Sequence, residues 1–285
     1  MDYPSLLLMQ SSEFLSPELL AELVQGRVDV VECVTETGST NDDLKSAVQS
    51  GRHAGRCVLR TAERQNAGRG TRGRTWANAN EALLFSVSMP WTASERIGGL
   101  ISLAAGEGVA RAAHALRIAA ALKWPNDIWA AEGKAGGILC EFVRSPDGVP
   151  HLVVGIGLNL RVKAAGRTTH GWRITSLVDA GARIDGTEDR TSLLASVVAG
   201  VVDQLRRLAR EGGKVVVDDW PLCDAFGDRT VAWVEADGAR VEIGRIRGID
   251  EAGFLLVEGR SGRTTLGGGA ALCNPLEFGY DNAAH

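Results

Sequence analysis

Hydrophobic and polar residues in the first part of the chain alternate between runs typical of strands and spacings typical of helices. Residues 16–18 supply an N-cap, a first-turn proline and an acidic side chain before apolar residues at helical spacing over 19–24, which predicts a short helix. β-Branched residues dominate 28–34, and capping residues at 37–41 separate this strand from a helical pattern at 42–48. The predicted order is helix, strand, loop, helix.

The middle of the chain continues this alternation. Strands are predicted where short apolar runs are bounded by turn residues, at 57–59, 83–89, 122–124, 128–129, 137–143 and 151–160. Helices are predicted where apolar residues recur at helical spacing, at 97–116, 191–210 and 216–226. No internal repeat or low-complexity tract interrupts the pattern.

The pattern changes near residue 227. Beyond it, short apolar segments are separated by Gly and Asp turns, which is typical of a small antiparallel barrel. These segments lie at 231–234, 240–243, 244–248, 254–257 and 264–266. We therefore predict one domain over 1–227 and a second over 228–285. The residues before 30 are too few for an independent domain, so we expect no separate DNA-binding module.

Composition agrees with a globular protein of about two domains, since the chain has 285 residues, of which 45% are hydrophobic and 23% charged. The net charge of −4 gives no overall basic field for nucleic acid or an anionic membrane. No signal peptide or membrane span is predicted. The cysteines are odd in number and form no CxxC pair, which excludes a disulfide scaffold and favours reduced core thiols in the cytoplasm, with a reactive cysteine as the alternative: Cys33, Cys57, Cys140, Cys223 and Cys273.

The most informative loop follows the strand at 57–59. Residues 64–74 contain four arginines and three glycines and no acidic residue. Glycines let the backbone approach a ligand, and guanidinium groups match phosphate or carboxylate oxygens, so this loop should close over an anion. It is not a Walker A loop, because Gly73-Arg74-Thr75 lacks the required lysine. A flexible, solvated turn is the alternative.

Two further segments carry residues suited to a binding or catalytic site. Residues 123–127 and the nearby Lys134 crowd amide, carboxylate and ammonium groups between predicted strands. Asp127 could hold a metal or accept a proton, and Lys134 could neutralise a transferring phosphoryl or acyl group, although a lysine–aspartate pair across a hairpin is the alternative. Gly155 and Gly157 alternate on a strand and leave a slot on one face, which tight packing would explain equally well.

Together, five segments in this order resemble the biotin protein ligases. They are Thr37-Gly-Ser-Thr-Asn41, Gln65-Asn-Ala-Gly-Arg-Gly-Thr-Arg-Gly-Arg-Thr-Trp76, Lys123-Trp-Pro-Asn-Asp127, Lys134-Ala-Gly-Gly-Ile-Leu139 and Gly155-Ile-Gly-Leu-Asn159. The resemblance is strong over 35–160, weaker over 172–177 and only architectural beyond 227. It implies an α+β fold: a class II synthetase-like catalytic domain, with a mixed sheet flanked by helices, and a small SH3-like β-barrel.

The resemblance also implies an ATP-dependent, AMP-forming ligase. Biotin's carboxylate would attack the α-phosphate of Mg²⁺-ATP, and the resulting biotinyl-5′-AMP would acylate a lysine on the biotin carboxyl carrier domain of a carboxylase such as acetyl-CoA carboxylase. No enzyme nucleophile is needed, and no nucleophile-elbow or Cys/His pattern is present. Positioning and electrostatics would then account for catalysis.

Site residues follow from the same resemblance. Those implied to bind biotin are Ser39, Thr40, Asn41, Gln65, Gly68, Arg69, Lys134, Gly137, Gly155 and Gly157. Those implied to bind the nucleotide are Arg69, Arg72, Arg74, Trp76, Lys123, Asn126, Asn159 and Trp172. Those implied to act in catalysis are Lys134, Arg69 and Asp127, the last also as a metal ligand.

Two departures from the family pattern matter. Thr71 stands where an arginine usually helps to retain the adenylate, and the last barrel strand, Leu272-Cys273-Asn274, lacks the arginine often found there to meet the nucleotide. Losing one charge-assisted contact costs about 1.5 to 3 kcal/mol, which weakens retention roughly 10- to 150-fold unless Arg72 substitutes. We therefore hypothesise that this chain releases its intermediate readily.

Three rival functions stay open from the residues alone. A lipoate or octanoate ligase or transferase would share the fold, but the basic loop ending in Trp76 argues against it. A non-catalytic biotin sensor would not need both Lys134 and Asp127. A nucleic-acid-binding module conflicts with the net charge, so we expect no DNA binding. The resemblance allows a homodimer, and we assign no role to the scattered histidines His53, His114, His151 and His170.

Overall fold

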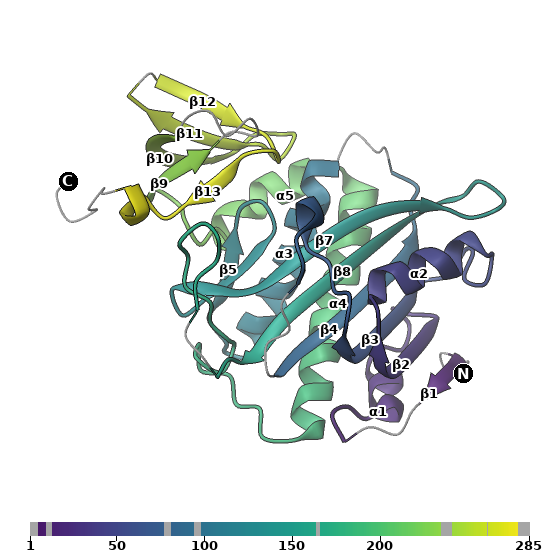
Figure 1. Ribbon diagram of the computed structural model, residues 1–285. Coiled ribbons are helices and arrows are strands. Elements are labelled where there is room, and N and C mark those ends of the chain that lie inside the picture. The colour runs from purple at the N-terminus through teal and green to yellow at the C-terminus, as the bar shows by residue number, and fades with distance from the viewer. Residues whose placement is uncertain are drawn as a thin grey trace.

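The computed structural model describes residues 5–9, 13–76, 81–93, 98–163, 166–234, 241–260 and 262–278. An eight-stranded mixed sheet forms its centre, in the order β1-β2-β3-β4-β8-β7-β6-β5 (Figure 1). The first three strands are parallel, and every later pairing is antiparallel. The strands are β1 (Ser5–Met9), β2 (Val30–Thr37), β3 (Val58–Gln65), β4 (Glu81–Pro90), β5 (Ala120–Lys123), β6 (Asp127–Ala130), β7 (Gly133–Arg144) and β8 (Pro150–Arg161).

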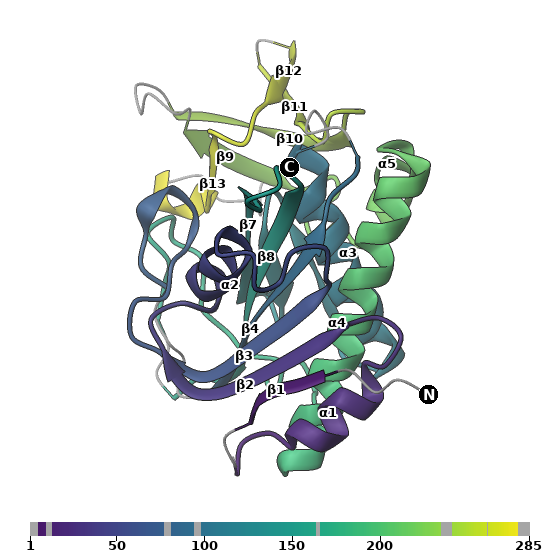
Figure 2. The same cartoon turned by 90° about the vertical axis from the view of Figure 1, so that its right-hand side faces the viewer.

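Helices cover both faces of this sheet. Helix α2 (Thr40–Gln49) lies on one face, and α1 (Pro17–Leu23), α3 (Gly98–Ala115), α4 (Thr187–Glu211) and α5 (Lys214–Asp219) lie on the other (Figure 2). Helices α3 and α4 approach closely at paired glycines, since a Cβ on Gly108 would come within 2.5 Å of the Gly200 carbonyl oxygen. The large apolar core therefore lies between the sheet and α1, α3, α4 and α5, and a smaller apolar cluster packs α2 onto the other face.

The C-terminal residues form a separate five-stranded antiparallel sheet, in the order β12-β11-β10-β9-β13 (Figure 1). Its strands are β9 (Thr230–Val234), β10 (Val241–Ile249), β11 (Leu255–Gly259), β12 (Gly262–Leu266) and β13 (Ala271–Cys273). The indole N–H of Trp124 donates to the Gly253 carbonyl at 2.9 Å, which joins this C-terminal β domain to the end of β5.

The predicted fold class is confirmed: a mixed sheet flanked by helices is followed by a C-terminal β domain. Two element predictions are wrong. The segments predicted at 240–243 and 244–248 are not separate over the described residues 241–248, because Gly244 packs against the backbone of β11 and β10 runs through it. The helix predicted at 216–226 ends at Asp219, and a 3₁₀ turn containing Pro221 follows.

The domain boundary at residue 227 stays a prediction. In the described part of the chain, no helix has the length and apolar character needed to span a membrane.

Candidate active site

Two adjoining cavities lie beside the large sheet, the first on its α2 side and the second next to the start of α3. The first cavity has a volume of about 220 Å³ and lies among α2, β7, β8 and the loop 66–76. The second cavity has a volume of about 280 Å³ and lies among that loop, the β5–β6 turn and the C-terminal β domain. Six residues line both cavities: Thr71, Arg74, Asn126, Lys134, Ile138 and Thr168. The two cavities therefore meet over Lys134.

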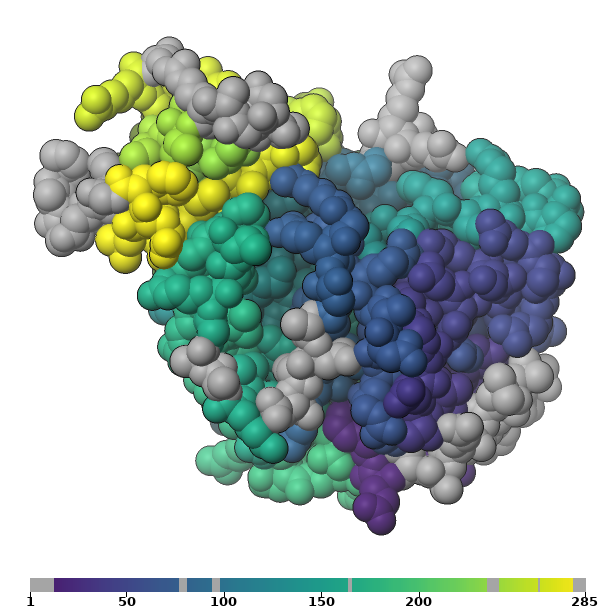
Figure 3. Space-filling view, viewed as in Figure 1, coloured from purple at the N-terminus to yellow at the C-terminus, as the bar shows by residue number. Residues whose placement is uncertain are grey.

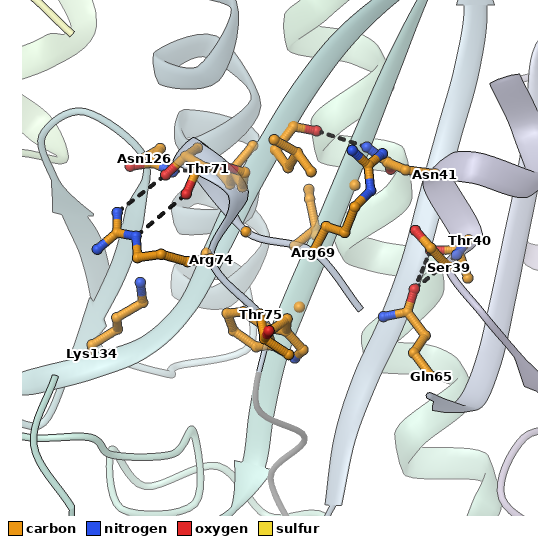
Figure 4. Close-up of a pocket in the computed structure, with 18 of the residues that line it drawn as sticks. Ser39, Thr40, Asn41, Gln65, Arg69, Thr71, Arg74, Thr75, Asn126 and Lys134 are labelled. Carbon is orange, nitrogen blue, oxygen red and sulfur yellow. Dashed lines mark hydrogen bonds between the residues drawn. The ribbon is translucent and has the colours of Figure 1, made fainter. Parts of the chain in front are cut away.

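A buried hydrogen-bond network shapes the α2 end of the first cavity. Ser39 is the N-cap of α2, so the helix begins with its polar end at the cavity. The Thr40 backbone N–H donates to Gln65 Oε1 at 2.8 Å (Figure 4). Thr40 Oγ1 lies 2.7 Å from Ser86 Oγ. Ser86 in turn donates to Asn41 Oδ1 at 2.6 Å. These buried polar groups hold one another in fixed orientations.

Glycines form the floor of the first cavity. Gly137 on β7 pairs with Gly157 on β8, and the Trp76 indole packs on both: a Cβ on Gly157 would lie 2.5 Å from the ring. A Cβ on Gly155 would lie 2.2 Å from Asn41 Oδ1. The slot predicted for the alternating glycines thus exists, and the side chains of Asn41 and Trp76 reach into it.

The Gly/Arg loop 66–76 is a short hairpin. The Gly70 N–H donates to the Arg74 carbonyl at 2.7 Å, and the Trp76 N–H donates to the Gly68 carbonyl at 2.9 Å. At its tip Arg72 has a left-handed backbone (φ 61°), and its guanidinium donates to the carbonyls of Gly268 and Ala270, each at 2.8 Å. Figure 3 shows this loop, in blue, crossing the face of the molecule toward the C-terminal β domain.

Arg69 is ion-paired at the mouth of the first cavity. Its guanidinium lies 2.6 Å from Asp42 and 2.8 Å from Glu141, and Lys45 lies 2.7 Å from the same glutamate. Burial would raise the pKa of Glu141, but its hydrogen bonds from Lys45, Asn41 and Arg69 outweigh burial and lower it. Arg69 therefore faces two carboxylates here, and any other anion must compete with them.

A lysine–aspartate cluster forms the base of the second cavity. Asp127 accepts from Lys123 at 3.1 Å and from Lys134 at 2.5 Å. Burial by itself would raise the pKa of Asp127, but the two ammonium groups outweigh it and hold that pKa at about 2. Lys123 also lies over the Trp172 ring, 5.6 Å from its centroid. The low pKa keeps the Asp127 carboxylate ionised at neutral pH.

Three residues predicted for the nucleotide do not share one cavity. Trp76 and Asn159 line the first cavity, and Trp172 lines the second. Asn159 donates to the Thr175 carbonyl at 3.0 Å, and the Trp172 indole N–H donates to the Leu272 carbonyl at 2.8 Å. Trp172 is thereby fixed against the C-terminal β domain.

Metal binding by the protein alone does not fit these residues. In the described ranges, no three His, Cys, Asp or Glu side chains gather as a metal site would require. Asp127 is a single carboxylate, and both of its oxygens already accept from lysines. The tightly bound octahedral shell of Mg²⁺ would need phosphate and water oxygens as most of its ligands.

Comparison with known proteins decides the family. The model of the biotin/lipoate A/B protein ligase family matches residues 33–159. The bifunctional ligase/repressor BirA of Salmonella typhimurium is 31% identical over 243 residues, which are 84% of this chain and 71% of that protein. The biotin–acetyl-CoA-carboxylase ligase of Mycobacterium tuberculosis is 31% identical over 242 residues, 83% of this chain and 85% of that protein. The chain belongs to the biotin protein ligase family.

A solved biotin protein ligase from Aquifex aeolicus, in complex with biotin and ATP, has the same fold. Its TM-score is 0.67 at 25% identity, and the match covers 86% of this chain and 98% of that one. The resemblance drawn from the five sequence segments is therefore confirmed for the family and the fold.

Sequence reasoning missed several residues of this biotin protein ligase site. Ser86 joins the network with Thr40 and Asn41, and its signal was a polar position within the apolar run of β4. Glu141 pairs with Arg69 although 72 residues separate them, so no local pattern could reveal that contact. His170 lines the second cavity beside Arg74.

The cysteines of this family member are all free thiols, as predicted. Burial raises the pKa of Cys33, Cys57 and Cys140 to about 12. At neutral pH these three thiols are protonated and poorly nucleophilic, so none of them suits a covalent mechanism.

Proposed function

We propose that this chain activates biotin with ATP to biotinyl-5′-AMP and transfers the biotinyl group to a lysine of a biotin carboxyl carrier domain. The observation that carries this proposal is the junction of the two cavities at Lys134, where a hydrogen-bonding cavity meets a cationic one. Membership of the biotin protein ligase family supports the reaction class.

In this proposal the first cavity binds biotin. Ser39, Thr40 and Gln65 offer hydroxyl, backbone and amide groups to the ureido ring, and their positions are fixed by α2 and β3. Gly68, Gly137 and Gly157 let Trp76 lie close against the sheet, and the bicyclic ring binds beside its indole. The carboxylate end then extends toward Lys134.

The second cavity binds the triphosphate. Arg72, Arg74, Lys123 and Lys134 line it together with one acidic residue, Asp127. This excess of positive charge comes from the hairpin 66–76 and from strands β5 and β7, and it complements a polyphosphate. Asn126 also lines this cavity, and its side chain is held in place because its amide donates to the Ile138 carbonyl at 2.8 Å.

Both chemical steps take place between the cavities. A carboxylate oxygen of biotin attacks the α-phosphorus, the bond to the β-phosphate oxygen breaks, and pyrophosphate leaves. The neutral amine of the acceptor lysine then attacks the biotinyl carbonyl, AMP leaves with the bonding pair, and the amine loses its proton to solvent. Lys134 stabilises the negative charge in both steps, and Arg69 moves from Asp42 and Glu141 to the biotin carboxylate.

The remaining parts of the proposal are coarser. Mg²⁺ enters with the nucleotide, because its chemistry favours phosphate and water oxygens over the lysine-paired Asp127. The five free thiols are compatible with a cytoplasmic location. We expect no DNA binding, and a homodimer is a further expectation that sedimentation would test.

Pyrophosphate release tests the function directly. The purified chain is mixed with Mg²⁺-ATP and, separately, with biotin, lipoate or octanoate, with and without a biotin carboxyl carrier domain. We expect biotin-dependent pyrophosphate and subsequent labelling of the carrier. Release with lipoate or octanoate instead would contradict the proposed substrate, and biotin binding without pyrophosphate would indicate a sensor.

A further inference from the structure

His170 lies in the wall of the second cavity, in the segment between β8 and α4. Its Nε2 is 3.3 Å from a terminal guanidinium nitrogen of Arg74. Its Nδ1 is 3.7 Å from Cys273 Sγ, and that sulfur is 3.6 Å from the Ala271 carbonyl oxygen. The imidazole thus connects the Gly/Arg loop to the last strand of the C-terminal β domain.

These contacts assign the protons on the ring. A guanidinium can only donate, so Nε2 accepts from Arg74 and carries no proton. The one proton of the neutral imidazole is then on Nδ1 and points to Cys273 Sγ, whose own proton points to the Ala271 carbonyl. Arg74, His170 and Cys273 can each donate to the next group only while the imidazole is neutral.

The charges around His170 explain why the ring is neutral. Burial lowers the pKa of His170, and the cations Arg74, Lys123 and Arg72 lower it further, whereas Asp127 opposes them. Cys273 faces the ring from β13. Glu277, from the 3₁₀ turn Pro275–Phe278, packs against the neighbouring Gly171 and lies 3.9 Å from Arg167. Positive charge therefore dominates on the cavity side.

We propose that His170 binds a phosphate group of the nucleoside triphosphate and takes up one proton from solvent at Nε2 when the nucleotide binds. This inference rests on the proposed function, because it concerns the same nucleotide. The triphosphate reverses the local charge, and Arg74 turns from the ring to a phosphate oxygen. Nε2, left without its donor, gains a proton and donates to a phosphate oxygen, while Nδ1–H keeps its contact with Cys273.

The proposal predicts that the affinity for the nucleotide depends on pH and that the affinity for biotin does not. Protonated His170 binds phosphate and neutral His170 does not, so nucleotide affinity falls as pH rises past the pKa of His170 in the complex. The KM for ATP of the unaltered chain should rise about 5- to 10-fold between pH 6.5 and pH 8.5. Biotin binds in the other cavity, so its KM should stay within about twofold.

The decisive variant is His170→Gln, whose amide keeps polarity but cannot take up a proton. Its matched control is His114→Gln, on the exposed last turn of α3. Pyrophosphate release is measured against ATP and biotin concentrations from pH 6 to pH 9. We expect the KM for ATP of His170→Gln to be flat and near the high-pH value of the unaltered chain, with His114→Gln unchanged.

Calorimetry gives a second readout that does not depend on turnover. An ATP analogue with a methylene bridge between the α- and β-phosphates is titrated into the biotin-bound protein in buffers of different ionisation enthalpy. On binding the analogue, the unaltered chain should take up about one proton more than the His170→Gln variant does. The imidazole carbon shift of His170, followed in the unaltered chain with and without the analogue, reports the same protonation without any substitution.

The outcomes separate the two proposals. If the unaltered chain releases no biotin-dependent pyrophosphate, the proposed function fails. If release is normal but His170→Gln keeps the pH slope, or His170 stays neutral in the nucleotide complex, the role of His170 is overturned and the proposed function stands.

Discussion

The two cavities solve the same problem, holding a small molecule, in different ways. In the first cavity, buried neutral groups from α2, β3 and β4 already hydrogen-bond to one another. In the second, cations from a hairpin and from strands β5 and β7 face a cavity that the C-terminal β domain closes. The first is preorganised by packing, whereas the second is organised by charge and by domain contact.

This difference has a consequence for solution conditions. Interactions between partly exposed charges weaken with salt, and hydrogen bonds among buried neutral groups do so much less. The Arg72 guanidinium spans the hairpin and the carbonyls of Gly268 and Ala270, so the second cavity also depends on how the two domains meet. Binding in the second cavity should therefore be the more sensitive to salt and to pH.

The largest effect should come from Lys134, which belongs to both cavities. Lys134→Ala should lower the rate of biotinyl-5′-AMP formation about 100- to 1,000-fold, because it removes the cation nearest the reacting groups. Single-turnover pyrophosphate release measures this rate. Lys214→Ala, at an exposed lysine paired with Asp218, is the matched control. A wild-type rate in Lys134→Ala would remove the central role given to this residue.

Thr71 lies where the two cavities meet, and its substitution tests retention of the intermediate. Arg72 donates to the C-terminal β domain, and we expect it to keep these contacts rather than replace the arginine usual at position 71. Thr71→Arg should slow adenylate dissociation about 10- to 150-fold. Thr264→Arg, on the exposed strand β12, adds the same charge elsewhere. An unchanged adenylate off-rate would refute the hypothesis that this chain releases its intermediate readily.

A smaller effect, on the KM for biotin and not on the KM for ATP, is expected at the glycines of β7 and β8 that line the first cavity. Gly157→Ala would place a Cβ 2.5 Å from the Trp76 ring and so displace the indole. We expect the KM for biotin to rise about tenfold and the KM for ATP to change less than about twofold, since only one cavity is altered. Gly186→Ala, where no atom lies within 4 Å of the added carbon, controls for the substitution itself. Equal changes in both KM values would mean that the cavities are not separable.

The smallest effect concerns the helix layer that supports both cavities. Burial, reinforced by Asp219, raises the pKa of Glu107 to about 8. Because the folded state holds this proton more tightly than the unfolded state, stability should fall as pH rises from about 4.5 to about 8. Glu107→Gln removes that dependence and should raise the melting temperature at pH 8 by a few degrees relative to the native chain.

Calorimetric melting at pH 5 and pH 8 measures this difference, and neither KM should change in Glu107→Gln. A melting temperature that falls equally in both proteins would assign the pH dependence to other groups.

Sequence patterns predicted the parts of this fold that local chemistry controls. The N-cap of α2 lies among the capping residues predicted at 37–41, at Ser39, because an N-cap depends only on its neighbours. The same patterns were wrong where a distant contact decides: Gly244 reads as a turn but continues β10, since it packs on β11. The helix predicted over 216–226 ended early, and Pro221 in that segment was the overlooked signal.

For the site, the residues could be predicted but their partners could not. The five segments identified the family, and the types and order of their residues are properties of the sequence alone. Tertiary structure alone decided that Arg69 meets Glu141, that Arg72 reaches Gly268 and that His170 meets Cys273. The physical reason is that such contacts depend on how sheet and domain bring together residues 72 to 196 positions apart, and no local propensity encodes that approach.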